Sequence, residues 1–379
     1  MFKFAPYLFK TLWRHRTRTL LTVSGSAVAL FVFSFVLTVQ EGLKRLTNQD
    51  DSVLVVFQAN KFCPATSHLP QDYDRIIAAM PGVREVAPIQ VFTNNCRASL
   101  DVIVFYGTYA EKVRRVRDFQ LVSGSWEDFE QHQDAGIVGR ALASRRGVDV
   151  GDRFSVGDVT VNVAGIFTSE NRAEEDYVYC HLDFLQRTRG LDLVGTVTQH
   201  EVWLDPSADP EEVAETIDAK LKGGQVETDT RTKGVFQASS LGDLIQLIDL
   251  SNYLGAACLG LMAVLVATTT IMTVEDRIGE HAVLQTLGFS TGRVFRLVLA
   301  ESVVMSTIGG LVGIGLATLV LTQARLSVGA EAVTVAFEPS LQLALMTGAA
   351  AMAVGVVSGL FPAWHASRVE IVSALRHAG

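Results

Sequence analysis

Four stretches of this 379-residue chain carry no charged side chain over lengths that could cross a bilayer. They cover residues 19–40, 250–274, 302–324 and 339–364. A helix that spans the hydrocarbon core needs about 20 apolar residues. A core helix of a water-soluble protein rarely stays free of charge for so long. The sequence therefore predicts an α-helical integral membrane protein with four transmembrane helices.

The charged residues are divided unevenly between the segment after the first span and the rest of the chain. Residues 41–249 hold 33 of the 40 acidic and 21 of the 32 basic residues, which leaves 7 acids and 11 bases elsewhere. Residues 1–18 hold five bases and no acid. Because basic residues favour the cytoplasmic side, we expect both termini in the cytoplasm and residues 41–249 outside. No contiguous basic face is present, so nucleic acid is not an expected partner.

The two glycine pairs Gly309–Gly313 and Gly355–Gly359 would let the spans pack closely. The charge pattern divides the chain into nine segments. The expected segments are a cytoplasmic N-terminal segment (1–18), a transmembrane helix (19–40), an extracytoplasmic domain (41–249), a second transmembrane helix (250–274), a cytoplasmic helix and loop (275–296), a third transmembrane helix (297–324), an outer loop (325–338), a fourth transmembrane helix (339–364) and a cytoplasmic tail (365–379).

The extracytoplasmic domain combines helix and strand patterns, so we expect a large α+β domain between helices one and two. Residues 52–57 are rich in β-branched side chains, as strands are. Residues 210–221 have a helical pattern that follows Asp209, a typical N-cap residue. We expect an α/β subdomain from about 50–98 and 196–245, with a β-rich subdomain inserted at about 99–195.

The sequence motifs of phosphate binding and of zinc-dependent hydrolysis are missing from this chain. It contains no G-x-x-x-x-G-K-[ST] loop for ATP phosphates and no H-E-x-x-H zinc motif. We therefore expect no catalytic residue, no metal site and no cofactor bound by this chain itself. Glu301 is the one acid near the interior of a span. Such a charge suggests a functional site, but its place near the cytoplasmic end fits a structural contact equally well.

The segment between the second and third spans has apolar residues at helical spacing and ends in a glycine, which predicts a short amphipathic helix. It closely resembles the E-R-x-x-E-x-x-x-L-x-x-L-G coupling helix of the MacB/FtsX superfamily of ABC permeases. Residues 14–22, 359–368 and 374–376 resemble other segments of that family, and residues 137–142, 147–152 and 163–167 resemble its periplasmic core. The resemblance assigns ATPase coupling to Arg277, Ile278, Glu280, Val283, Leu284, Leu287 and Gly288.

The resemblance implies a permease subunit, similar to MacB or to LolC and LolE, without a fused ATPase domain. A separate MacB/LolD-like ATPase would bind ATP and Mg. ATP hydrolysis by that subunit would move the periplasmic domain, a process called mechanotransmission. This motion would drive efflux or release of a substrate from the periplasm or the outer leaflet. The implied setting is the bacterial inner membrane, with a permease homodimer or a paralogous heterodimer. A periplasmic adaptor of the membrane-fusion type is left open.

Two other functions remain compatible with this resemblance. An FtsX-like regulator would use the same motion to activate cell-wall hydrolases, although FtsX itself has a smaller outer domain. A non-transporting sensor or scaffold would bind a ligand outside. The sequence departs from many relatives at Gln285, Thr286 and Ile371, which would change the fine contact with the ATPase.

Three cysteines lie in the predicted outer domain, and Cys258 lies in the second span. Outer cysteines tend to pair in an oxidising compartment. We expect a disulfide between Cys63 and Cys96, with Cys180 left over, and three free thiols as the alternative.

Overall fold

The computed structural model describes residues 16–47, 52–61, 66–94, 102–117, 119–277, 286, 290–324, 327–330, 333–337 and 339–368. The chain divides into two compact units. The membrane unit consists of Met1–Glu41, Leu247–Ala324 and Glu338–Gly379, and the outer domain of Gly42–Gln246 and Arg325–Phe337.

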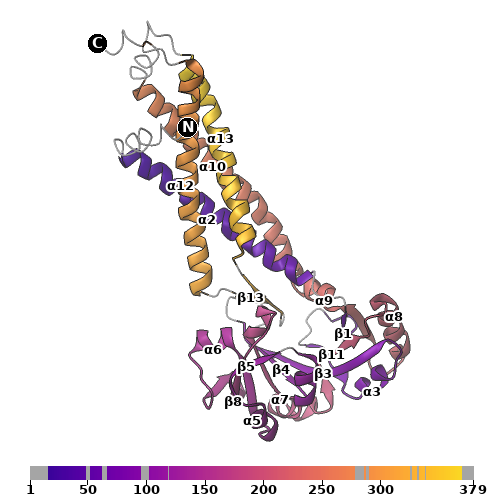
Figure 1. Ribbon diagram of the computed structural model, residues 1–379. Helices are drawn as coiled ribbons and strands as arrows, with labels where there is room; N and C mark the ends of the chain where they lie inside the picture. Colours follow the sequence, from indigo (N-terminus) through magenta and orange to yellow (C-terminus); the bar gives the residue numbers. More distant parts are fainter. Residues whose placement is uncertain are drawn as a thin grey trace. The chain divides into compact units, whose positions relative to one another are not determined.

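Four long helices, which Figure 1 shows running alongside one another, build the membrane unit. They are α2 (Arg16–Thr47), α10 (Gly242–Asp276), α12 (Thr291–Ala324) and α13 (Leu341–Ser367). Each is long and apolar enough to span a membrane, which confirms the prediction of four transmembrane helices. Helix α12 begins at Thr291, inside the segment expected to form the cytoplasmic loop. A helix can continue past its apolar stretch because charged residues such as Arg293 and Arg296 are tolerated outside the hydrocarbon core.

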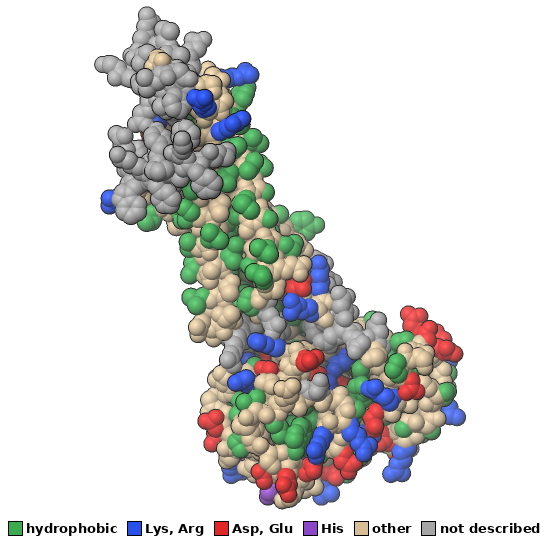
Figure 2. Space-filling view, in the orientation of Figure 1, with side chains coloured by type: hydrophobic (Ala, Val, Ile, Leu, Met, Phe, Trp, Pro, Cys, Tyr) green, Lys and Arg blue, Asp and Glu red, His purple; other side chains and the backbone are tan. Residues whose placement is uncertain are grey.

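Large apolar side chains lie on the outside of this bundle. Leu20, Leu261, Leu311 and Leu341 are each at least 65% exposed. Figure 2 shows apolar side chains spread over the visible face of the helices. A water-soluble bundle would bury these residues, whereas lipid solvates them. The exposed face therefore agrees with a bundle that lies in a bilayer.

Glycines bring the helices into close contact. A Cβ atom added to Gly309 of α12 would lie 2.5 Å from the Ser26 Cβ of α2. A Cβ added to Gly355 of α13 would lie 2.9 Å from the Ser306 Cβ of α12. Both glycine pairs of the spans thus face a neighbouring helix, as the sequence predicted.

The outer domain contains a 10-stranded mixed sheet with the order β12-β1-β11-β3-β4-β9-β6-β8-β5, and β7 pairs with β8. Its strands are β1 (Val53–Gln58), β3 (Val83–Thr93), β4 (Val104–Thr108), β5 (Gln120–Gly124), β6 (Ala135–Gly139), β7 (Arg153–Val156), β8 (Val159–Thr168), β9 (Tyr177–His181), β11 (Gln199–Leu204) and β12 (Thr228–Thr232). A separate two-stranded sheet pairs β2 (Leu69–Pro70) with β10 (Thr196–Val197), and β13 (Ser327–Ala330) forms a hairpin with β14 (Val333–Ala336).

Short helices connect these strands, and the α8 prediction is confirmed to the residue. Asp209 caps α8, its carboxylate accepting a hydrogen bond from the Glu211 amide. The helical segments are α3 (Tyr73–Ala78), α4 (Ala110–Val116), α5 (Trp126–Gln131), α6 (Arg140–Arg146), η3 (Arg172–Asp176), α7 (Leu182–Arg189), η4 (Leu191–Leu193), α8 (Pro210–Leu221) and α9 (Lys233–Ser240).

Strand β3 joins two parts of the outer domain. Its first part pairs with β11, and its last four residues, Gln90–Thr93, pair with β4. One apolar core lies around β1, β11, α3 and α8, and two others lie around β4, β6, β8 and β9. The first core comes from both ends of the domain sequence, and the other two come mainly from its middle.

Candidate functional site

The predicted coupling segment lies almost wholly beyond the described residues. Of its seven assigned residues, Arg277 is described. Ile278, Glu280, Val283, Leu284, Leu287 and Gly288 are outside the described ranges. Arg277 directly follows α10, and its amide donates a hydrogen bond to the Val274 carbonyl at 3.1 Å. The arginine is therefore held at the helix end from which the predicted coupling segment continues.

Arg277 forms a buried ion pair with Glu301 of α12, and the Nη1–Oε2 distance is 3.6 Å. Both side chains are at least 93% buried. A buried charge needs a partner of opposite sign, so the pair explains why an acid is present at this level of α12. Of the two interpretations that the sequence left open for Glu301, the structural contact is the one described. The pair links the end of α10 to the first turns of α12.

Apolar residues surround this end of the bundle. Val274 of α10, Val294 and Val298 of α12, and Ala363 and Ala366 of α13 form one buried cluster. Three helices therefore pack together here.

The outer domain contains a second group of buried charges, which we call the ion network: Arg117, Glu174, Glu201 and Lys233. The Arg117 guanidinium donates to the Glu174 carboxylate at 2.6 Å and also to the Glu201 carboxylate. The Lys233 ammonium lies 3.6 Å from the Glu174 carboxylate and 3.9 Å from that of Glu201. All four side chains are at most 16% exposed. Two cations thus compensate two carboxylates inside the domain.

The members of the ion network come from distant parts of the chain. Arg117 follows α4, Glu174 lies in η3, Glu201 in β11, and Lys233 is the first residue of α9. No local motif connects them, so the sequence did not mark them as a group. One signal was available: Glu201 interrupts an otherwise uncharged strand, and every residue of that strand is buried. A charge at such a position requires a buried counter-ion.

The charges shift the pKa values within the ion network. Burial pushes the pKa of Glu201 upward, but Arg117 and then Lys233 outweigh it and hold this pKa below its ordinary value. Burial acts to lower the pKa of Arg117, but Glu201 together with Tyr179, Glu174 and Tyr106 outweighs it, so this pKa is raised. Both partners therefore stay ionised, which is the state in which they hold each other.

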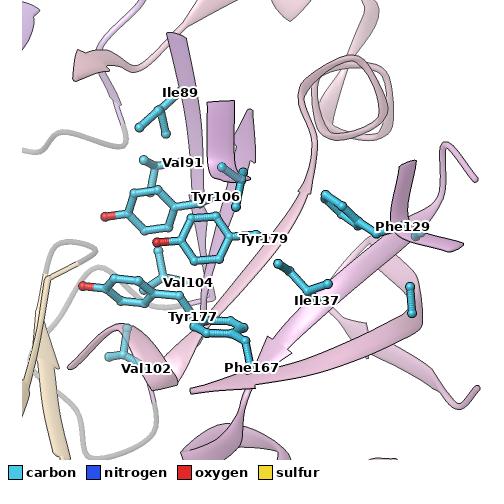
Figure 3. Packing of buried hydrophobic residues seen from close by; sticks show 13 residues of the cluster. Ile89, Val91, Val102, Val104, Tyr106, Phe129, Ile137, Phe167, Tyr177 and Tyr179 are labelled. Atoms are coloured by element: carbon cyan, nitrogen blue, oxygen red, sulfur yellow. The ribbon is translucent and has the colours of Figure 1, made fainter. Parts of the chain in front are cut away.

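Three tyrosines lie beside the ion network. Figure 3 shows the rings of Tyr106, Tyr179 and Tyr177 with their hydroxyl groups pointing to the same side. The Arg117 guanidinium lies 5.8 Å from the centre of the Tyr179 ring, which is a cation–π contact. Burial raises the pKa of all three, that of Tyr177 to about 12. The phenols thus stay neutral and add no negative charge.

The cysteine predictions have different outcomes. Cys63 and Cys96 lie outside the described residues, so their disulfide stays a prediction. Cys180 in β9 is a fully buried free thiol, and Cys258 in α10 is a free thiol that is partly buried. Burial raises the pKa of Cys180 well above its ordinary value, which keeps the thiol protonated and unreactive.

Comparison with known proteins agrees with a chain of four spans that carries an outer domain after the first span. Residues 19–220, more than half of the chain, match the family described as MacB-like periplasmic core domain. Residues 252–371 match the family described as FtsX-like permease C-terminal. The chain belongs to the MacB/FtsX superfamily of ABC permeases. It is accordingly a membrane protein of the permease type, with an extracytoplasmic domain after its first helix.

The similar curated proteins fall into two sizes. The chain is 22% identical over 393 residues to an uncharacterised ABC transporter permease of Methanocaldococcus jannaschii, covering 98% of this chain and 96% of that protein. It is 25% identical to the pyoverdine export ATP-binding/permease protein PvdT of Pseudomonas fluorescens, with 97% of this chain and 58% of that protein covered. It is 24% identical to the macrolide export ATP-binding/permease protein MacB of Nitrobacter winogradskyi, with coverage of 97% and 59%.

The chain therefore spans somewhat more than half the length of PvdT and MacB. Among solved structures, the periplasmic region of MacB from Actinobacillus actinomycetemcomitans is similar, with 11% identity and a TM-score of 0.37, over 50% of this chain and 92% of that one.

Proposed function

We propose that this chain is the permease subunit of an ABC transporter, in which a separate ATPase subunit moves the outer domain and so drives efflux or release of a substrate. The observation that carries the proposal is the match of residues 19–220 to the MacB-like periplasmic core domain. Two of the similar proteins, PvdT and MacB, are named for export and combine an ATP-binding and a permease part.

In this mechanism, ATP and Mg bind to the partner ATPase. The movement of the ATPase then displaces the segment after Arg277. The buried pair of Arg277 and Glu301 passes the displacement from α10 to α12. The permease acts as a homodimer or paralogous heterodimer in the inner membrane, with both termini in the cytoplasm. The charge asymmetry of the sequence supports this orientation.

Leu287 provides the sharpest test of ATPase coupling. Leu287→Asp places a charge on the apolar face of the predicted coupling helix, so it should weaken the association with the ATPase about tenfold or more, which corresponds to about 1.4 kcal/mol. The matched control is Leu191→Asp, because Leu191 is 82% exposed in the outer domain. Co-purification and ATPase assays in nanodiscs would measure the effect. A Leu287→Asp variant that binds the ATPase and keeps full activity would refute the coupling role.

A regulator of cell-wall hydrolases is the second candidate, and the match of residues 252–371 to the FtsX-like permease C-terminal favours it. The two candidates differ in what the outer domain contacts. Crosslinking of the intact complex followed by mass spectrometry separates them. A cell-wall hydrolase on the outer domain supports regulation, and an adaptor or an exported molecule supports efflux.

A further inference from the structure

The segment between α12 and α13 belongs to the outer domain and not to the membrane unit. Residues 325–337 cluster with the outer domain, and within them β13 and β14 form an antiparallel hairpin. Val333, Thr334, Val335 and Phe337 are at most 8% exposed. A loop that only joined two spans would leave its side chains in water. The burial therefore shows that this hairpin is docked within the domain.

The hairpin docks on η3 and its neighbours through specific contacts. The Thr334 hydroxyl donates to the Ala173 carbonyl of η3 at 2.7 Å, and the Thr334 amide donates to the Tyr177 hydroxyl at 3.4 Å. On the other strand, Gly329 lies so close to Val102 that an added Cβ would be 2.7 Å from the Val102 Cβ. The docking thus combines hydrogen bonds with close backbone packing.

A second connection to the membrane unit reaches the same short segment. Glu174 is the residue after Ala173, and its carboxylate lies 3.6 Å from the Lys233 ammonium. Lys233 begins α9, and Leu241 alone separates α9 from α10. Two adjacent residues of η3 are therefore linked to the chain before α10 and to the chain between α12 and α13.

The segment η3 is itself fixed firmly in the domain. The Asn171 side chain caps it by accepting from the Ala173 amide at 3.1 Å. The Asp176 carboxylate accepts from the Arg145 guanidinium at 2.8 Å. Gly139 at the end of β6 lies against the backbone of Glu175, where no Cβ would fit. A displacement of η3 therefore moves the strands and helices around it.

We propose that η3 is a relay at which forces from α10 and from the β13–β14 hairpin, which lies between α12 and α13 in the chain, enter the outer domain together. This inference rests on the proposed function, because it describes how the motion would reach that domain. The hairpin stays docked while the domain moves, since its buried residues would otherwise be exposed to water. The outer domain then moves as a single body when α10 and the β13–β14 hairpin move.

Thr334→Val tests the relay in the full-length permease in nanodiscs, by hydrogen exchange with mass spectrometry. The variant removes the hydroxyl that donates to Ala173 and keeps the β-branched shape. We expect amide exchange to become about tenfold faster in the hairpin, in η3 and at the start of α9, as loss of one buried hydrogen bond would cause. Thr334→Ser keeps the hydroxyl and should restore the slow exchange.

Thr196→Val is the matched control, because its hydroxyl also donates to a backbone carbonyl, that of Leu193, at 2.8 Å. This variant should leave η3 and α9 unchanged. Lys233→Met tests the opposite direction, and because coupling is reciprocal it should speed exchange in the hairpin. If Thr334→Val affects the hairpin alone, and Lys233→Met affects α9 and η3 alone, the relay does not exist.

A separate measurement distinguishes the relay from the proposed function. Exchange of the wild-type complex with its ATPase is compared with and without ATP and vanadate. An ATP-dependent change at η3 that Thr334→Val abolishes supports both. If ATP changes nothing in the wild-type outer domain, the proposed function fails. If ATP changes η3 equally in wild type and Thr334→Val, the function stands and the relay is refuted.

Discussion

Glu201 illustrates how single residues of the outer domain depend on distant partners. A carboxylate in a sheet interior is strongly destabilising without cations beside it, and here Arg117 and Lys233 supply them. Such a group contributes little net stability compared with apolar residues of the same volume, but loss of one member leaves an uncompensated charge. The ion network therefore fixes how the two parts of the domain fit together.

Glu201→Gln should destabilise the permease by about 3 kcal/mol, because it leaves two buried cations with one carboxylate. Asp229→Asn is the control, since Asp229 pairs with Arg231 at a site where the two side chains are 31% and 40% exposed. That variant should change stability by about 1 kcal/mol at most. Denaturant unfolding of the purified proteins measures both. Equal effects would contradict the role of burial.

His200 predicts how stability depends on pH. Its Nε2 contacts the Pro70 carbonyl at 3.2 Å, and burial lowers its pKa to about 4. The unfolded chain binds this proton near pH 6.5, so between about pH 6.5 and 4 the unfolded state holds more protons. Stability should therefore fall as the pH falls through this range. A His200→Gln variant should show a flatter pH dependence of its unfolding midpoint. An unchanged slope would contradict the assignment.

At the scale of elements, small residues decide how the helices of the membrane unit pack. Gly309 and Gly310 lie next to each other on α12, yet Gly309 faces α2, and a Cβ at Gly310 would meet Ala351 of α13. Both neighbours approach so closely because neither glycine carries a side chain. The spacing of such glycines was readable from the sequence. Which helix each glycine meets was not, because that depends on how the four helices are arranged in space.

Gly309→Ala should destabilise the bundle by about 1–3 kcal/mol, because its Cβ would meet Ser26 at 2.5 Å and the Val23 carbonyl at 3.0 Å. Gly315→Ala in the same helix is the control. Among the described residues, no atom beyond its own stretch of helix lies within 4 Å of its added Cβ, so the change should be neutral or stabilise by up to about 1 kcal/mol. Thermal unfolding in nanodiscs would compare the two variants. A larger loss for Gly315→Ala would show that this packing is not formed.

At the scale of the whole molecule, local patterns in the sequence predicted the parts, and the structure supplied the links between them. The charge-free stretches predicted the four helices, and Asp209 marked the start of α8, because both signals act over a few turns. The ion network and the hairpin at β13 and β14 could not be derived in this way. They join residues more than thirty positions apart, and Thr334 contacts Ala173 across 161 positions. Only the folded sheet brings them together.

The last prediction concerns the side of the membrane on which each segment lies. We expect residues 42–246 and 325–337 to face the same side, since they form one compact unit. The N-terminal segment should face the other side because it holds five bases and no acid. Single cysteines at Asp158, which is exposed, and at Lys10 would be introduced after Ser replacement of the four native cysteines. In intact cells a membrane-impermeant maleimide should label position 158 and reach position 10 only after lysis. Labelling of position 10 alone would reverse the orientation.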